Sequence, residues 1–325
     1  MNTVPTIDAP PVRDDQAPPS TARPAAAPRR SSSVVRWWRR GGLSAVGLAL
    51  PTLLVFGYFS WKPLVQGITM SFQKWNFVAD PSWVGLSNFE YVLSDPLLGQ
   101  AVLNTLYFTV LAILFGFPLP ILLAVAVSTL RGRTRRLASF LAYLPVIVPP
   151  VVAILLWKVF YDSSESGLFN RLLGFVGIPP QPWLNDAATA MPSIVLEATW
   201  AGAGTATLIY LAAITSVRPE LYEAAELDGA GILSRIWHVT LPQLRTVILI
   251  MLLLQIIGAA QVFAEPFLFT GGGPQNATLT VLVLLYRYAF NEGDYGAATA
   301  LGVLLALVLA GLSALYLLVT KKWND

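Results

Sequence analysis

Six long apolar runs constrain the fold of this chain more than any other feature. They lie near residues 43–60, 102–130, 137–160, 191–214, 246–269 and 297–320. A helix that crosses a bilayer needs ~20 mostly apolar residues, which these runs approach or exceed. With 55% apolar and 12% charged residues, the chain is too apolar for an ordinary soluble protein. The sequence therefore predicts an all-α, multi-pass membrane protein with six transmembrane helices.

The second run is longer than one crossing requires, and two prolines interrupt it. Pro118 and Pro120 each lack the N–H that an α-helix uses for its hydrogen bonds. We expect a kink or an extra half-turn at this point in the span.

Basic residues predict the orientation of the spans. Sixteen of the 21 Lys and Arg residues lie in the N-terminal tail, in residues 131–136, in residues 218–245 or at Lys321 and Lys322. Positively charged loops stay on the cytoplasmic side. Both termini are therefore expected in the cytoplasm, which agrees with an even number of spans.

The N-terminal tail differs from the rest of the chain in composition. Residues 1–42 are basic, and residues 1–33 are rich in Pro, Ala, Ser and Arg without apolar periodicity, so we expect a disordered cytoplasmic tail. A signal peptide is the alternative, but no small-residue cleavage pattern follows the first apolar run. We expect that run to be a retained helix, with an external loop completing residues 43–100 and the core domain in residues 101–322.

Residues 218–244 form a polar, glycine-punctuated segment between two spans. Pro219 suits a first helical position, and acidic residues near it favour the positive end of the helix dipole. Asp228-Gly229 and Gly231 then interrupt the helix. The pattern predicts a short helix, a turn and a second short helix, with small residues that allow another surface to approach.

The spacing within this segment resembles the EAA loop of permease subunits of binding-protein-dependent ABC importers. Glutamate to glycine is six residues, and glycine to the Leu-Pro pair is twelve. The matching residues are Glu223, Ala224, Ala225, Asp228, Gly229, Ala230, Val239, Leu241 and Pro242. The resemblance implies a transmembrane domain of the type I ABC importer class, in which this loop is the coupling helix that docks on a cytoplasmic ATPase. The alternative is a merely solvated amphipathic loop.

Other passages resemble the carbohydrate class of these permeases. They are VGLSNFEYVL at 84–93, the Asn104-Thr105 pair, and the stretch from TGGGP at 270 to Phe290. The resemblance implies a sugar or oligosaccharide solute, a location in the cytoplasmic (inner) membrane, and four kinds of partner. These are a second related permease, two ATPase subunits, an extracytoplasmic solute-binding protein and membrane lipid.

Residue types that the chain lacks narrow its chemistry. The chain has no cysteine, and its single histidine, His238, has no evident partners for catalysis or metal binding. No GxxxxGK[ST] motif occurs, so this chain is not expected to bind ATP. Transport energy, with ATP and Mg²⁺, would come from partner subunits, and the chain itself would hold no cofactor, no metal and no catalytic residue.

Polar residues inside the spans are the candidates for a solute path, because leaving them in lipid is costly. The selected candidates are Glu197, Trp200, Tyr210, Gln255, Gln261 and Glu265. Gln261 and Glu265 would share one helix face, being one turn apart. Hydroxyl and amide groups of this kind also form hydrogen bonds between helices, which is the alternative for each.

Three other functions stay open at this stage. An ABC permease for a non-sugar solute is compatible with the EAA spacing. A secondary transporter would need ion coupling, with Glu197 or Glu265 as proton carriers, and usually an internal repeat that the sequence does not show. An intramembrane enzyme would need a convergent nucleophile or metal set, which is not evident.

Overall fold

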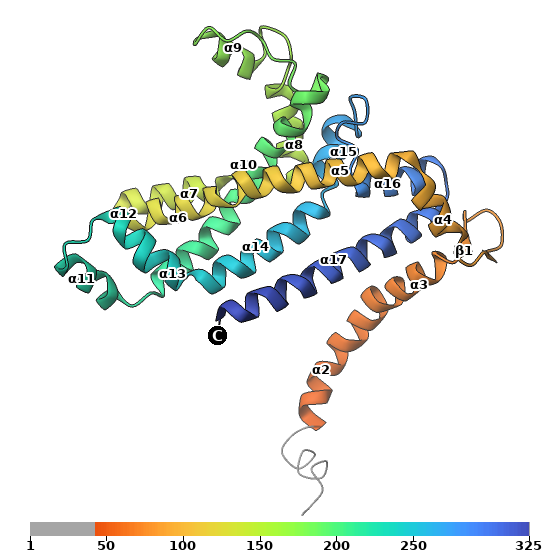
Figure 1. Ribbon diagram of the computed structural model, residues 1–325, viewed down its shortest axis with the longest axis horizontal. Coiled ribbons are helices and arrows are strands. Elements are labelled where there is room, and N and C mark those ends of the chain that lie inside the picture. Colours follow the sequence, from red (N-terminus) through yellow and green to blue (C-terminus); the bar gives the residue numbers. More distant parts are fainter. Residues whose placement is uncertain (1–42, 325) are drawn as a thin grey trace, which may run out of the picture. The chain divides into compact units, whose positions relative to one another are not determined.

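The computed structural model describes residues 43–324 and consists almost entirely of helices (Figure 1). The predicted disordered tail therefore lies outside the described residues. The chain separates into two units, one ending at Trp61 and one beginning at Lys62. The described part of the first unit is α2 (Leu43–Phe56) followed by the π-helical turn η2 (Gly57–Trp61). The predicted division into residues 43–100 and 101–322 stays a prediction.

The second unit contains the remaining elements. They are α3 (Lys62–Met70), β1 (Gln73–Lys74), β2 (Ser82–Trp83), α4 (Ser87–Ser94), α5 (Pro96–Leu111), η3 (Ala112–Gly116), α6 (Pro118–Thr129), α7 (Gly132–Ile147), α8 (Pro150–Phe160), α9 (Leu168–Gly174), η4 (Trp183–Asn185), α10 (Ala187–Thr215), α11 (Pro219–Leu227), α12 (Ile232–Arg235), η5 (Ile236–Thr240), α13 (Leu241–Gln243), α14 (Arg245–Ala260), α15 (Ala264–Thr270), α16 (Val281–Tyr286), η6 (Arg287–Asn291) and α17 (Tyr295–Asn324). β1 and β2 form one antiparallel pair, with Gln73 opposite Trp83.

Five helical segments of the described chain are long and apolar enough to cross a membrane. They are Val46–Met70, Pro96–Thr129, Ala187–Thr215, Arg245–Thr270 and Tyr295–Lys321. A sixth span exists if α7 and α8, which meet at an angle of 96°, are counted together. The predicted number of six spans is thus confirmed when α7 and α8 are counted as one span.

The bend between α7 and α8 corrects the prediction of one continuous span over residues 137–160. Val148 and Pro149 are extended, with ψ of 125° and 133°, before α8 begins at Pro150. Two consecutive prolines remove two helical N–H donors, and each also disfavours the α conformation in the residue before it. The apolar run continues through this point, so hydropathy alone does not reveal the break.

The irregularity predicted for the second span is confirmed. A single π-helical turn, η3, lies between α5 and α6 and ends at Gly116, directly before Phe117 and Pro118. Such π-helical turns within α-helices are frequent at functional sites.

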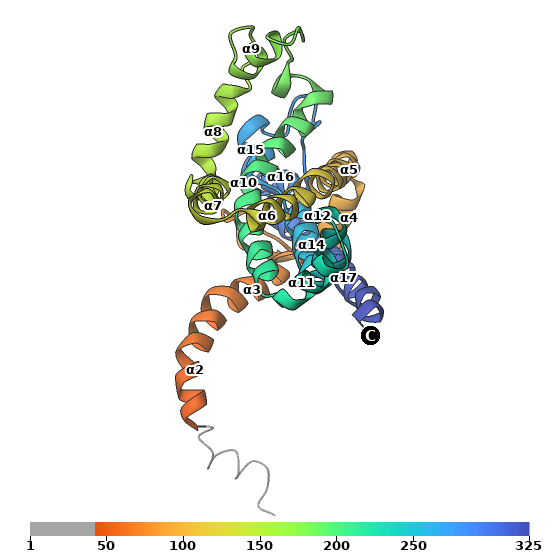
Figure 2. The same cartoon turned by 90° about the vertical axis from the view of Figure 1, so that its left-hand side faces the viewer.

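α10 is the central helix of the second unit. It packs against α6, α7 and η3, and Figure 2 shows it between α7 on one side and α14 on the other. Gly204 permits its close approach to α7, because a Cβ there would lie 2.6 Å from Val146 Cγ2 and 2.8 Å from the Ala142 carbonyl oxygen. Tyr210 and Ile214 bury their side chains with Ala124 of α6 further along the helix.

A second packed region surrounds the first turn of α17. Val92 of α4 and Ala297 of α17 are fully buried there, together with Leu284 of α16. The Asn88 amide donates to the carbonyls of Ser71 and Gln73, each at 2.9 Å. These bonds tie the end of α3 and strand β1 to α4, and Tyr288 donates to Asp95 nearby. In Figure 1 this region lies at the opposite end of the second unit from α11 and α12.

The close contact at Gly204 yields a stability prediction. A Gly204→Val substitution should overlap Val146 and the α7 backbone, and overpacking of this kind typically costs about 1–3 kcal/mol. Gly311→Val is the matched control, since a Cβ at Gly311 of α17 meets nothing within 4 Å. Thermal unfolding of the detergent-solubilised protein should therefore show a lower midpoint for Gly204→Val only. Equal midpoints for both variants would contradict the α7–α10 packing described above.

Candidate functional site

The polar segment between α10 and α14 folds as predicted, into a short helix, a turn and a second short helical stretch. α11 ends in a turn in which Ala230 N–H donates to the Ala225 carbonyl at 2.9 Å, and Gly229 N–H donates to the Glu226 carbonyl at 3.0 Å. This is the hydrogen-bond pattern of a Schellman motif, which requires a left-handed residue that is usually glycine. Gly229 occupies that position with φ of +77°. The Asp-Gly pair of the sequence is thus explained by the backbone.

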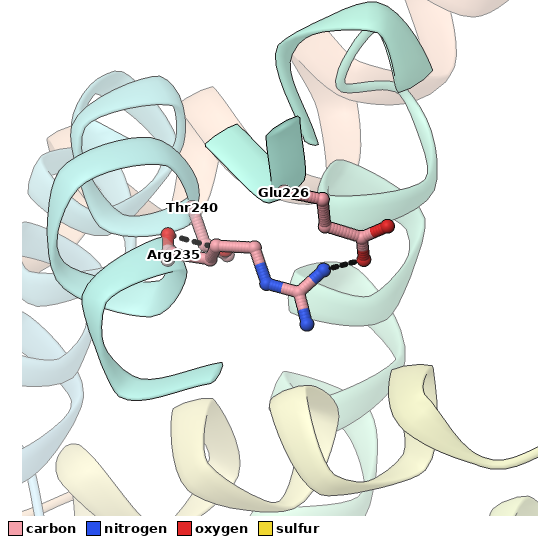
Figure 3. Close-up of polar contacts among 3 residues, drawn as sticks. All are labelled: Glu226, Arg235 and Thr240. Carbon is pink, nitrogen blue, oxygen red and sulfur yellow. Dashed lines mark hydrogen bonds and ion pairs between the residues drawn. The ribbon is translucent and has the colours of Figure 1, made fainter. Parts of the chain in front are cut away.

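Side-chain contacts across the turn hold the two helical stretches together. Glu226 of α11 and Arg235 of α12 form an ion pair, and their side chains point toward each other (Figure 3). The Thr240 hydroxyl donates to the Arg235 carbonyl at 3.4 Å and also hydrogen-bonds the Tyr222 hydroxyl at 3.1 Å. Thr240 and Leu244 are buried, and Leu244 shares a core with Tyr210 and Ile214 of α10, so the segment is anchored to the helical bundle.

Four large apolar side chains of this segment are exposed. Leu227 is 90% exposed, and Leu233, Trp237 and Ile232 are 73%, 66% and 61% exposed. Exposed apolar groups of this kind are typical of surfaces that contact another protein or a membrane. These four residues are not among the nine that match the EAA spacing, although large apolar side chains outside the spans can be seen in the sequence.

The structure gathers the nine residues selected from the EAA spacing on this one segment. Five of them are exposed, namely Glu223, Ala224, Asp228, Gly229 and Pro242, and four are half-buried, namely Ala225, Ala230, Val239 and Leu241. His238 Nδ1 lies 2.9 Å from the Ser234 carbonyl oxygen, a local contact within its own turn.

A cavity of about 610 Å³ lies among α5, η3, α10, α14 and α15. Ligand-binding cavities typically measure ~300–1,000 Å³. Its polar lining comes from Thr199, Thr205, Gln255, Gln261 and Glu265, and the rest is apolar or glycine. Gly116, at the end of the π-helical turn, has no side chain, so two of these polar groups lie close to its Cα atom. A Cβ on Gly116 would lie 3.4 Å from Thr199 Oγ1 and 3.5 Å from Gln255 Nε2.

The threonines of the cavity, half-buried Thr199 and exposed Thr205, differ from the buried threonines of the bundle. Thr207 donates to the Ala203 carbonyl at 2.7 Å, and Thr105 donates to the Ala101 carbonyl at 2.8 Å, both within their own helices. Within residues 43–324, the side chains of Thr199, Thr205 and Gln255 make no hydrogen bond. Their polar atoms are thus available to a molecule in the cavity.

Three of the six candidates for the solute path line this cavity and three do not. Gln255, Gln261 and Glu265 belong to its wall. Glu197 is buried at 1% exposure, Tyr210 lies in the core beside α6, and Trp200 packs on Trp157 with ring centroids 5.5 Å apart. Thr199 and Thr205 also line the cavity, although they are not among the six candidates.

The prediction that Gln261 and Glu265 share one helix face is wrong. α14 ends at Ala260, and α15 begins at Ala264, so the two residues belong to different helices. Pro266 lacks the N–H that would bond the Val262 carbonyl in a continuous helix. That carbonyl instead accepts a hydrogen bond from the Thr280 hydroxyl at 3.0 Å. Both residues nonetheless reach the same cavity.

Comparisons with known proteins agree on one family. Residues 116–325 match the family described as "Binding-protein-dependent transport system inner membrane component". The arabinooligosaccharides transport system permease protein AraP of Bacillus subtilis is 33% identical over 270 residues, which is 82% of this chain and 86% of that protein.

Two solved structures of bacterial alginate ABC transporters contain chains of similar fold. One, of a transporter involved in import of the acidic polysaccharide alginate, matches with a TM-score of 0.79 and 27% identity over 90% of this chain and 99% of that chain. The other, in complex with an alginate pentasaccharide-bound periplasmic protein, matches with a TM-score of 0.77 and 27% identity over 89% of this chain and 98% of that chain. Together with the family match, these similarities establish that the chain belongs to the inner-membrane permease components of binding-protein-dependent ABC transporters.

Proposed function

We propose that this chain forms part of the translocation path of an ATP-driven importer for a sugar or oligosaccharide. The cavity beside α10 supports this proposal most directly, because hydroxyl and amide groups without hydrogen-bond partners lie in its otherwise apolar wall. Sugars present hydroxyl groups for hydrogen bonding and apolar ring faces for packing. The relatives support this class, since one is a permease for arabino-oligosaccharides and another transporter imports alginate.

Energy for transport comes, in this proposal, from ATPase subunits that bind the segment of residues 218–244. Its exposed apolar side chains, Leu227, Ile232, Leu233 and Trp237, supply the contact surface. The nine EAA residues give this surface its shape, and Gly229 with φ of +77° keeps its tip without a side chain. ATP and Mg²⁺ are bound by the partner subunits, and this chain holds neither.

A second permease subunit completes the path, and an extracytoplasmic solute-binding protein delivers the sugar. The alginate-bound periplasmic protein seen with one similar transporter supports the delivery step. Both termini and residues 218–244 face the cytoplasm, as the distribution of basic residues predicts.

The docking surface predicts a selective loss of assembly. Leu233→Asp places a charge at the centre of an apolar contact and should reduce ATPase recovery with the tagged chain by at least about tenfold, because desolvating an unpaired charge costs several kcal/mol. The measurement is quantitative mass spectrometry of the complex after mild-detergent purification. Ser234→Asp, which adds the same charge at a neighbouring exposed residue, should retain more ATPase. Full recovery and normal uptake with Leu233→Asp would refute the proposed surface.

The cavity predicts a transport defect without a folding defect. Gly116→Val introduces methyl groups where Thr199 and Gln255 converge, and should reduce ATP-dependent sugar uptake into vesicles by at least about tenfold, since small misplacements at such sites are costly. Gly99→Val is the control, because a Cβ at Gly99 of α5 meets nothing within 4 Å. Both variants should reach the membrane in equal amounts. Unchanged uptake by Gly116→Val would place the solute elsewhere.

A further inference from the structure

The charge of the cavity wall restricts the chemical class of the solute more than the volume of the cavity does. We propose that Glu265 makes this cavity selective against anionic solutes, so that the imported sugar is neutral or carries an amino group. This inference rests on the proposed translocation function and narrows its substrate class.

Among the described residues, 43–324, Glu265 is the only ionisable one that lines the cavity, and no Lys, Arg or His side chain of that part belongs to the wall. Lys158 of α8, a helix that packs against α15, donates to the Leu268 carbonyl at 3.2 Å and lines a different pocket, together with Asp162. The described part of the wall therefore offers a solute one acidic group and no cation.

A second acidic side chain, Glu197 of α10, directly precedes Ala198, which lines the cavity. Glu197 is 1% exposed, and its Oε2 atom has no hydrogen-bond partner in the described part of the chain. No positive charge from α10 offsets Glu265 at this point, because the helix contains no Lys or Arg. Glu265 and Glu197 thus place two acidic side chains at this part of the wall, with no basic side chain on α10 beside them.

This environment opposes a uronate sugar. A carboxylate that leaves water needs a cationic partner or several donors, and like charges brought together lower affinity further. A neutral sugar meets no such penalty. Its hydroxyls can donate to the Glu265 carboxylate and accept from the Gln255 amide, and hydrogen bonds to charged groups are the stronger kind. An ammonium group on the sugar would pair with Glu265 directly.

The fold that this chain shares with related permeases does not determine whether anionic solutes are accepted. A transporter with a chain of similar fold imports alginate, an acidic polysaccharide. Charge selection must therefore come from particular side chains on a common framework, and Glu265 is the one that the cavity of this chain presents.

The test is equilibrium binding of three trisaccharides to the intact complex, purified from its native membrane without the solute-binding protein. Arabinotriose is neutral, chitosan trisaccharide is cationic and trigalacturonate is anionic. The wild-type complex should bind at least one of the first two about tenfold or more tightly than trigalacturonate, as measured by isothermal titration calorimetry. Glu265→Gln should reduce this ratio, and Glu265→Lys should reverse it in favour of trigalacturonate.

Two further variants control for the loss of a carboxylate outside the cavity and for misfolding of the Glu265 variants. Glu165→Gln removes an exposed carboxylate from the loop after α8, outside the cavity wall, and should leave the ratio unchanged. Gln255→Lys keeps Glu265 and adds a cation at another part of the wall, so it should raise trigalacturonate affinity even where the Glu265 variants fail to fold. Equal binding of arabinotriose and trigalacturonate by the wild type, or a ratio that neither lysine variant alters, would overturn the inference. Binding of none of the three by a correctly assembled complex would overturn the proposed sugar function itself.

Discussion

Backbone hydrogen bonding inside a membrane is the constraint on which the rest of this structure depends. Lipid offers no partner to a free N–H or C=O group, so irregular backbone is tolerated only where protein covers it or where it borders a cavity. The two irregular points that matter here obey this rule. The π-helical turn ends at Gly116, and the break after Ala260 precedes Phe263, and both places line the same cavity.

At the break after Ala260, a replacement hydrogen bond limits the free-energy cost of interrupting the helix. Pro266 leaves the Val262 carbonyl without its helical donor, and the buried Thr280 hydroxyl replaces that donor from the segment before α16. Thr280 is itself held beside Val281, whose N–H donates to the Thr105 hydroxyl at 3.0 Å. An unsatisfied buried carbonyl would cost about 1–3 kcal/mol of stability. Because the Thr280 hydroxyl satisfies the Val262 carbonyl, α15 can change direction and bring Glu265 to the cavity without that loss.

The sequence predicts the parts of this fold that have a local cause. Apolar length indicates the spans, and the Asp228-Gly229 pair indicates the turn because a Schellman motif needs a left-handed residue. The bend at Pro149 and the break at Val262 lie inside continuous apolar runs, so hydropathy does not mark them, and prolines mark them only roughly. Polarity alone does not separate the residues that line the cavity from those that do not, because Glu197 and Tyr210 are polar yet buried. Burial depends on which helices meet, which is not a local property.

The proposed coupling segment and the cavity are joined by the same two helices. α10 leads into the segment and α14 leads out of it, and both also line the cavity, at Thr199 and Gln255. At 1.5 Å per residue, the ten residues from Arg245 to Gln255 span about 15 Å of helix. Thr240 and Leu244 are buried at the base of α14, and the Tyr222–Thr240 hydrogen bond joins α11 to that base. A displacement of the segment would therefore be transmitted along α14 to the break after Ala260, which lies at the cavity wall.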